Sequence, residues 1–166
     1  MNTPPTTILG IDPGYGRVGY GVIRVVGGHA SCVAYGCIET SPRETLSQRL
    51  VIIAAEIRIL VRTHAPHIAA IERLFFSTNT TTAMDVAHAR GVILLTLAQN
   101  SSLPIIELSP LQVKQAATGS GNAPKQQVQT MIARLLKLDT IPKPDDAADA
   151  LAIALCASTY RPTVSL

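Results

Sequence analysis

The chain has 166 residues, a net charge of +3, 47% hydrophobic residues and only 15% charged residues, against roughly 25% charged in an average globular protein. This composition excludes an intrinsically disordered chain, and the length predicts a single domain over residues 1–166. No apolar stretch reaches the ~20 residues that span a bilayer and no secretory signal is visible, so we expect no membrane partner and a cytoplasmic location.

Five short runs rich in β-branched or apolar residues predict strands, over residues 7–13, 17–26, 31–39, 67–72 and 104–108. The short Gly-rich link between the first two runs indicates a hairpin. The run at 67–72 follows a helical segment, and a strand that follows a helical crossover most naturally lies parallel to an earlier strand.

Apolar residues that recur at three- or four-residue intervals, together with capping and breaking residues, predict helices over residues 42–65, 79–100, 110–117, 124–137 and 145–158. Ser41 is expected to cap the first helix, because Pro42 suits the first helical position and Glu44 completes an S-x-x-E capping box. The order of the elements predicts an α/β fold with a mixed five-stranded sheet flanked by helices.

Acidic residues stand where such a fold can gather them. Asp12 and Glu72 end two predicted strands, and Asp146 and Asp149 share one face of the last helix. Convergent carboxylates repel one another unless a cation lies between them, and their oxygens suit Mg²⁺ or Mn²⁺. A strand-end Asp is also a common turn residue, and Asp145, Asp146 or both could instead cap the last helix.

Four segments resemble the RuvC family of Holliday-junction resolvases, in the family's order and over residues 8–157: ILGIDPGYGRVGYGVI, IERLFFSTNTTTAMDVAHARGVI, SPLQVKQAATGSGNAPKQQVQTMI and PDDAADALAIAL. The resemblance implies an RNase H-like fold and a homodimer that cuts two opposed strands of a four-way DNA junction. It also implies two Mg²⁺ ions per active site, for which Mn²⁺ substitutes, and the branch-migration motor proteins RuvA and RuvB as partners. The mild positive charge permits a nucleic-acid partner without requiring one.

The resemblance also assigns roles to single residues. The catalytic, metal-binding acids of the family fall on Asp12, Glu72, Asp146 and Asp149. Spacing alone leaves the choice between Asp145 and Asp146 open, and the family pattern selects Asp146, which leaves Asp145 as a helix cap.

Basic and aromatic positions of the family have counterparts as well. Lys114 and Lys125 match its two lysines, Lys114 as a catalytic residue that stabilises charge on the scissile phosphate and Lys125 as a DNA contact. Phe75 matches an aromatic residue that stacks on or wedges between bases at the junction. Arg73, beside Glu72, is a further DNA-binding candidate, through a contact to the DNA backbone, or else a partner in an ion pair. The alternative is that these residues have no role in DNA binding or catalysis, since a lone helical lysine is usually a solvated surface residue and a phenylalanine is often buried.

The predicted helix at 79–100 is the candidate dimer interface, because its small residues Ala83, Ala87, Ala89 and Gly91 allow close approach. The alternative is that this helix packs only on its own sheet.

Other functions fit the sequence less well. The G-x-G-x-x-G match at residues 14–19 is followed by a strand pattern rather than a helix, which argues against dinucleotide binding. An RNase H-like nuclease that acts on RNA or an RNA–DNA hybrid shares the carboxylate chemistry. An actin-type ATPase also begins with a G-I-D-x-G strand but needs two domains. A DNA-binding module without catalysis leaves the set of acids unexplained. The three cysteines have no C-x-x-C spacing, so we expect free thiols rather than a zinc site or disulfides.

Overall fold

The computed structural model describes residues 4–74 and 80–160. Its sheet has the strand order β3-β2-β1-β4-β5. The strands are β1 (Thr6–Asp12), β2 (Arg17–Val26), β3 (His29–Glu39), β4 (Ile68–Glu72) and β5 (Ile105–Leu108). The first three form antiparallel pairs, whereas β4 pairs in parallel with both β1 and β5. The predicted hairpin, the parallel β1–β4 pair and the mixed five-stranded sheet are therefore confirmed.

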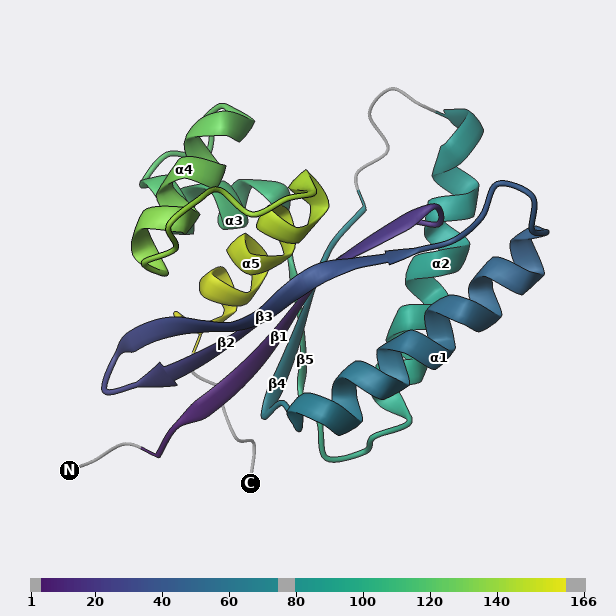
Figure 1. Cartoon of the computed structure of the whole chain (residues 1–166), viewed down its shortest axis with the longest axis horizontal. Coiled ribbons are helices and arrows are strands. Elements are labelled where there is room, and N and C mark those ends of the chain that lie inside the picture. Colours follow the sequence, from purple (N-terminus) through teal and green to yellow (C-terminus); the bar gives the residue numbers. More distant parts are fainter. Residues whose placement is uncertain (1–3, 75–79, 161–166) are drawn as a thin grey trace.

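Helices cover both faces of the sheet, with α1 and α2 on one side and α3, α4 and α5 on the other (Figure 1). The helices are α1 (Leu46–His64), α2 (Thr80–Ala98), α3 (Pro110–Thr118), α4 (Lys125–Leu135) and α5 (Asp145–Ala157). Two hydrophobic cores result, one on each face of the sheet. None of the described helices has both the length and the hydropathy that a membrane crossing requires.

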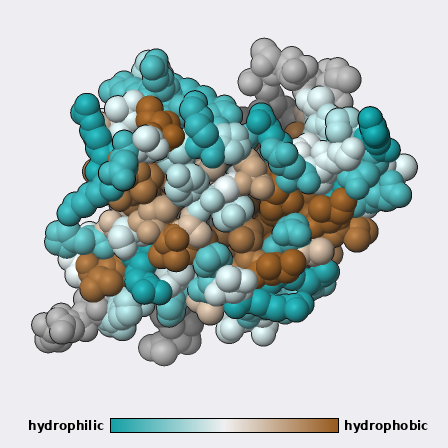
Figure 2. All heavy atoms as spheres, in the orientation of Figure 1, coloured by the Kyte–Doolittle hydropathy of each residue, from teal (hydrophilic) through white to brown (hydrophobic). Residues whose placement is uncertain are grey.

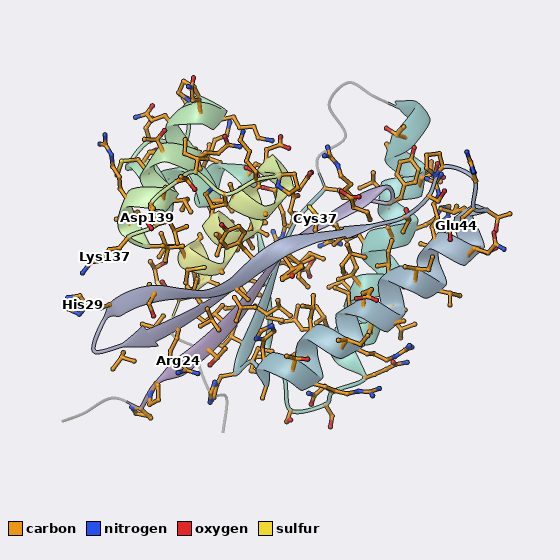
Figure 3. All side chains as sticks on the ribbon, in the orientation of Figure 1. Arg24, His29, Cys37, Glu44, Lys137 and Asp139 are labelled. Carbon is orange, nitrogen blue, oxygen red and sulfur yellow. The ribbon has the colours of Figure 1, made fainter. Side chains whose placement is uncertain are left out.

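The start of α1 differs from the prediction. Thr45 caps this helix, and its capping box is completed by Gln48. Ser41 and Glu44 do form the expected hydrogen bond, from the Ser41 backbone amide to the Glu44 carboxylate at 2.9 Å, but they close an isolated turn ahead of the helix, where Glu44 is labelled in Figure 3. Two S/T-x-x-E/Q boxes therefore lie in succession, and only the second leads into α1, the amphipathic segment that the sheet can bury.

The α5 helix lies directly on the backbone of β1 and β2. A Cβ atom added at Gly10 would overlap the backbone of Ala150 and Ala154, and one added at Gly21 would overlap that of Leu151. Because no side chain separates helix from strand there, α5 is buried along most of its length. This close contact fixes where the acids at its N-terminus lie.

The opposite face of the sheet uses large aliphatic side chains, such as Ile57 of α1 and Ile93 of α2, against Leu9 and Ile71 of the strands. Apolar side chains also reach the outside of this layer, and Figure 2 shows apolar surface over α1, where Val51 is 69% exposed.

Candidate active site

Asp12 and Glu72 lie side by side at one edge of the sheet. The parallel pairing of β1 and β4 ends with Ile11 opposite Ile71, and the two acids are the next residues on these strands. Neighbouring parallel strands therefore deliver both carboxylates to the edge at which their carboxyl ends meet, which is the usual ligand position in α/β folds. The sequence placed these two residues at this edge.

Asp146 and Asp149 reach the same edge because α5 begins there. Gly19 pairs with Asp12 across the β1–β2 hairpin, and the backbone of Asp146 lies so close to Gly19 that a Cβ atom would overlap it. The absent side chain of Gly19 therefore allows the first turn of α5 to lie next to Asp12.

A cavity of about 250 Å³ opens at this point and gathers most of the expected residues. Its walls are formed by Asp12, Glu72, Pro110, Val113, Lys114, Lys125, Val128, Asp149 and Ala152. Three carboxylates and two lysines from five different elements, β1, β4, α3, α4 and α5, thus share one hollow. Asp146 is not part of the wall, although its charge acts on Asp12.

Burial and mutual repulsion disfavour the charged forms of these carboxylates. Burial raises the pKa of Asp12 well above its ordinary value, and the charges of Glu72, Asp149 and Asp146 raise it further. Burial, together with the charge of Asp149, also raises the pKa of Glu72 to about 7, against the lowering effect of the two lysines. The pKa of Asp149 is raised chiefly by burial. A positive charge in the cavity would relieve this repulsion.

Lys125 supplies one such charge. Its ammonium lies 2.7 Å from the carboxylate of Asp145 and 2.8 Å from that of Asp149. Burial alone would lower the pKa of Lys125, but these hydrogen bonds outweigh it and raise the pKa. The hydrogen bond from Lys125 lowers the pKa of Asp145. The expectation that Asp145 caps α5 is wrong, because Pro144 occupies the N-cap position without a side-chain cap and Asp145 pairs with Lys125 instead.

Asp146 faces the β2–β3 side of the site. Its carboxylate lies 3.3 Å from Nε of Arg17 and 3.9 Å from the thiol of Cys37, which is labelled in Figure 3. Burial, with the nearby charge of Asp146, raises the pKa of the Cys37 thiol to about 11. The thiol is therefore a neutral neighbour of the carboxylate, and Arg17 is the cation that partners it.

The remaining predicted residues are distributed as follows. Lys114 of α3 lines the cavity and lowers the pKa of Glu72 by its charge. Arg73 is exposed, its backbone amide donates to the carbonyl of Leu108 at 2.7 Å, and no ion pair joins it to another residue in the described part of the chain. Phe75 lies outside the described residues.

The donor set fits a divalent cation. Hard carboxylate oxygens line the cavity, their pKa values are raised by burial and by mutual repulsion, and the ammonium of Lys125 already pairs with one of them, that of Asp149. The side chains are not arranged as a finished cluster, since within residues 4–74 and 80–160 no three His, Cys, Asp or Glu side chains converge closely enough to hold an ion. Holding a cation therefore requires the carboxylates to turn toward one another.

Two arginines at the site went unnoticed in the sequence. Arg17 pairs with Asp146, and Arg90 of α2 donates from Nε to the backbone carbonyl of Glu72 at 3.0 Å. Neither arginine belongs to a sequence motif that indicates its role, because each contacts a residue of a different element that only folding brings close. The close glycines had a visible signal in the sequence, since Gly19 and Gly21 alternate on one predicted strand, Gly10 lies on the strand before it, and the last helix is rich in alanine.

Comparison with known proteins gives a consistent result. The family described as "Crossover junction endodeoxyribonuclease RuvC" matches residues 8–157. Curated relatives of that name include one from Petrotoga mobilis, 49% identical over 154 residues, which cover 93% of this chain and 94% of the relative. Another, from Desulfitobacterium hafniense, is 51% identical over 149 residues, which cover 90% of each chain.

Solved structures agree with this match. RuvC from Thermus thermophilus superposes with a TM-score of 0.85 at 35% identity, covering 93% of this chain and 95% of that one. A second structure, the same organism's RuvC in complex with a Holliday junction substrate, superposes with a TM-score of 0.82 at 33% identity, covering 93% and 94%. The RNase H-like fold expected from the sequence is thereby confirmed.

Proposed function

The chain belongs to the RuvC family of crossover junction endodeoxyribonucleases, and from that membership we propose that it resolves four-way DNA junctions by paired, symmetric nicks. The observation that carries the proposal is the cavity in which Asp12, Glu72 and Asp149 meet Lys114. We propose Mg²⁺ as the cofactor, two ions per site with Mn²⁺ as a substitute, and products with 5′-phosphate and 3′-hydroxyl ends.

The residues of the cavity divide the work. Bound divalent cations would polarise the scissile phosphate and lower the pKa of the attacking water. Asp12, Glu72 and Asp149 provide the oxygens that hold such ions, with Asp146 as a fourth ligand once it turns from Arg17. Lys114 lines the same cavity as the acids, and there its ammonium can stabilise charge on the phosphate.

Three further residues are proposed DNA contacts. Lys125 is held by two acids, and once released from them its ammonium can contact a backbone phosphate. Arg73 is exposed at the end of β4, beside the site, and can contact the same backbone. Phe75 keeps its proposed role in stacking on bases, which rests on the family pattern alone.

A junction cut symmetrically needs two active sites, so we propose a twofold homodimer formed through α2. The outer face of this helix exposes five residues at intervals of four and three, the spacing of a coiled-coil seam: Met84, His88, Gly91, Leu95 and Ala98. Met84 and Leu95 are each 61% exposed, which leaves apolar surface for a partner helix. Of the small residues expected there, Ala89 is buried against its own sheet, because it lies on the opposite face of α2.

Sedimentation of the purified protein tests the dimer. We expect the wild type to sediment as a dimer at micromolar concentration and the double variant Met84→Glu, Leu95→Glu as a monomer, because two charges would enter the apolar seam. Val51→Glu is the matched control, since Val51 is at least as exposed, at 69%, but lies on α1, and this variant should remain dimeric. A monomeric wild type, with and without junction DNA, would refute the proposed dimer.

The motor proteins RuvA and RuvB, and the cytoplasmic location, stay predictions from the family resemblance and the composition. A related nuclease that acts on an RNA–DNA hybrid would use the same carboxylates, so the substrate must be tested directly.

The test of the function compares three labelled substrates: a mobile four-way junction, a plain duplex of the same sequence and an RNA–DNA hybrid. With Mg²⁺ we expect paired nicks in the junction and little cleavage of the other two, and with EDTA no cleavage of any. Preferred cleavage of the hybrid would establish the alternative nuclease. Junction cleavage that persists in EDTA would overturn the metal mechanism.

A further inference from the structure

The peptide group that follows Glu72 is held on both sides. Its carbonyl oxygen, that of Glu72, accepts a hydrogen bond from Nε of Arg90 at 3.0 Å. Its amide, that of Arg73, donates to the carbonyl of Leu108 on β5 at 2.7 Å. Because a peptide group is planar, holding both of its polar ends fixes the ψ angle of Glu72 and with it the direction in which the backbone presents the carboxylate.

Arg90 makes this contact from α2, on the face of the sheet opposite α5 (Figure 1). Its side chain is only 16% exposed, and its guanidinium also pairs with the carboxylate of Glu107 on β5. Glu107 stands opposite Ile71 in the β4–β5 pairing, one position before Glu72. One largely buried side chain therefore joins α2 to the ends of β4 and β5.

We propose that Arg90 is a positioning residue for Glu72, acting through the Glu72 carbonyl. The inference rests on the proposed function, in which Glu72 is a metal ligand. A guanidinium suits the task because its Nε–H and Nη–H groups point in fixed, different directions, so one side chain serves the Glu72 carbonyl and the Glu107 carboxylate together. A lysine has the same charge but a single ammonium on a flexible chain, which cannot reproduce this fork.

The position of Arg90 gives the contact a second consequence. Its neighbour Gly91 belongs to the outer face of α2 that we propose as the dimer seam, whereas Arg90 points inward to the sheet. The helix that would carry the partner subunit is therefore joined by one side chain to the backbone of Glu72, the proposed metal ligand.

Arg90→Lys tests the proposal, and Glu107→Gln is the matched variant that removes the partner charge while leaving Arg90 in place. The first readout needs neither DNA nor metal: hydrogen exchange of the Arg73 amide, which belongs to the held peptide, in the ¹⁵N-labelled full-length protein. We expect Arg90→Lys to speed this exchange about tenfold, from the loss of a charge-assisted hydrogen bond, and Glu107→Gln to speed it about twofold.

The second readout is the affinity of the free protein for Mn²⁺, followed by electron paramagnetic resonance, together with kcat and junction affinity for cleavage. Arg90→Lys should weaken Mn²⁺ binding and lower kcat about tenfold, with junction affinity within about twofold of wild type, because misplacing one ligand impairs chemistry more than binding. Glu107→Gln should change kcat no more than about threefold.

Unchanged Arg73 exchange in both variants, or unchanged kcat and Mn²⁺ affinity in Arg90→Lys, would overturn the proposal. Losses of kcat, junction affinity and melting temperature in equal measure would also overturn it, since they would mark a structural role only. A wild type that fails to cut junctions would refute the proposed function, while the exchange measurement would still decide whether Arg90 holds the peptide of Glu72.

Discussion

The two faces of the sheet are built on different principles. On the α5 face, glycines of β1 and β2 meet a helix rich in alanine, and backbone packs on backbone. On the α1 and α2 face, large aliphatic side chains such as Ile57 and Ile93 fill the space between helix and strand. Three candidate catalytic acids come from the end of β1 and the start of α5, where the packing is closest.

The comparison shows that one face of the sheet fixes the position of its helix closely, whereas the other face accommodates substitutions. Backbone atoms cannot move aside for an added group, so the α5 face fixes the helix, and the acids it carries, in one place. Interdigitated aliphatic side chains can repack by changing rotamers, so the other face tolerates exchanges between aliphatic residues of similar volume, and it can bear an apolar seam on its outside. Arg90 crosses this division, from α2 to the end of β4.

The largest effect is expected for the loss of an acid at the site beside α5. Asp12→Asn should lower the rate of junction cleavage in Mg²⁺ by about 10³-fold or more, because it removes a charged ligand from the cavity. Junction affinity, measured by gel shift without metal, should be retained. Cleavage near the wild-type rate would mean that the cavity does not hold the reacting metal.

A smaller effect is expected for Lys114→Ala, which leaves every carboxylate in place. We expect cleavage to slow about 10²-fold, since one stabilising charge on the phosphate is lost, while junction affinity falls only about twofold. Rates at saturating junction separate the two quantities. Equal losses in rate and affinity would reduce Lys114 to a general DNA contact.

A stability measurement tests the contrast between the two faces directly. Gly10→Ala should lower the free energy of unfolding by about 1–3 kcal/mol, because its methyl group would overlap the backbone of Ala150 and Ala154. Gly16→Ala is the control, since no atom lies within 4 Å of a Cβ atom there, and it should stay within about 0.5 kcal/mol of wild type. Urea unfolding measures both, and equal stabilities would contradict the close packing of α5.

The smallest expected effect is the pH dependence of the metal-free protein. The pKa of Glu72 rises on folding from 4.5 to about 7, so between these values the folded state binds more protons than the unfolded state. Stability therefore falls as pH rises through this window, and the melting temperature should drop by a few degrees from pH 5 to pH 8.

Glu72→Gln is the control for that measurement, and its melting temperature should drop less over the same pH range. Added Mg²⁺ should restore the wild type at pH 8, because a cation binds the ionised carboxylates of the folded state. A melting temperature of the wild type that rises with pH would show that the carboxylates are not repelling one another.

Local signals in the sequence predicted much of the fold and part of the site. The change from a period of two residues to a period of three or four located the strands and helices, and a strand after a helical crossover implied the parallel β1–β4 pair. The position of Asp12 and Glu72 at the same edge of the sheet followed from that pairing alone. The predicted start of α1 was wrong because two capping boxes compete over residues 41–48, and only burial of the helix decides between them.

By itself, the sequence determined which elements form, which strand ends carry acids and which family the motifs resemble, because these properties depend on residues close together in the chain. Only the tertiary structure decided that Asp145 pairs with Lys125, that Arg17 holds Asp146 and that Arg90 fixes the peptide of Glu72. These contacts join residues on separate elements. Their partners are set by how closely α2 and α5 approach the sheet, a distance that follows from packing and is not written in any local pattern.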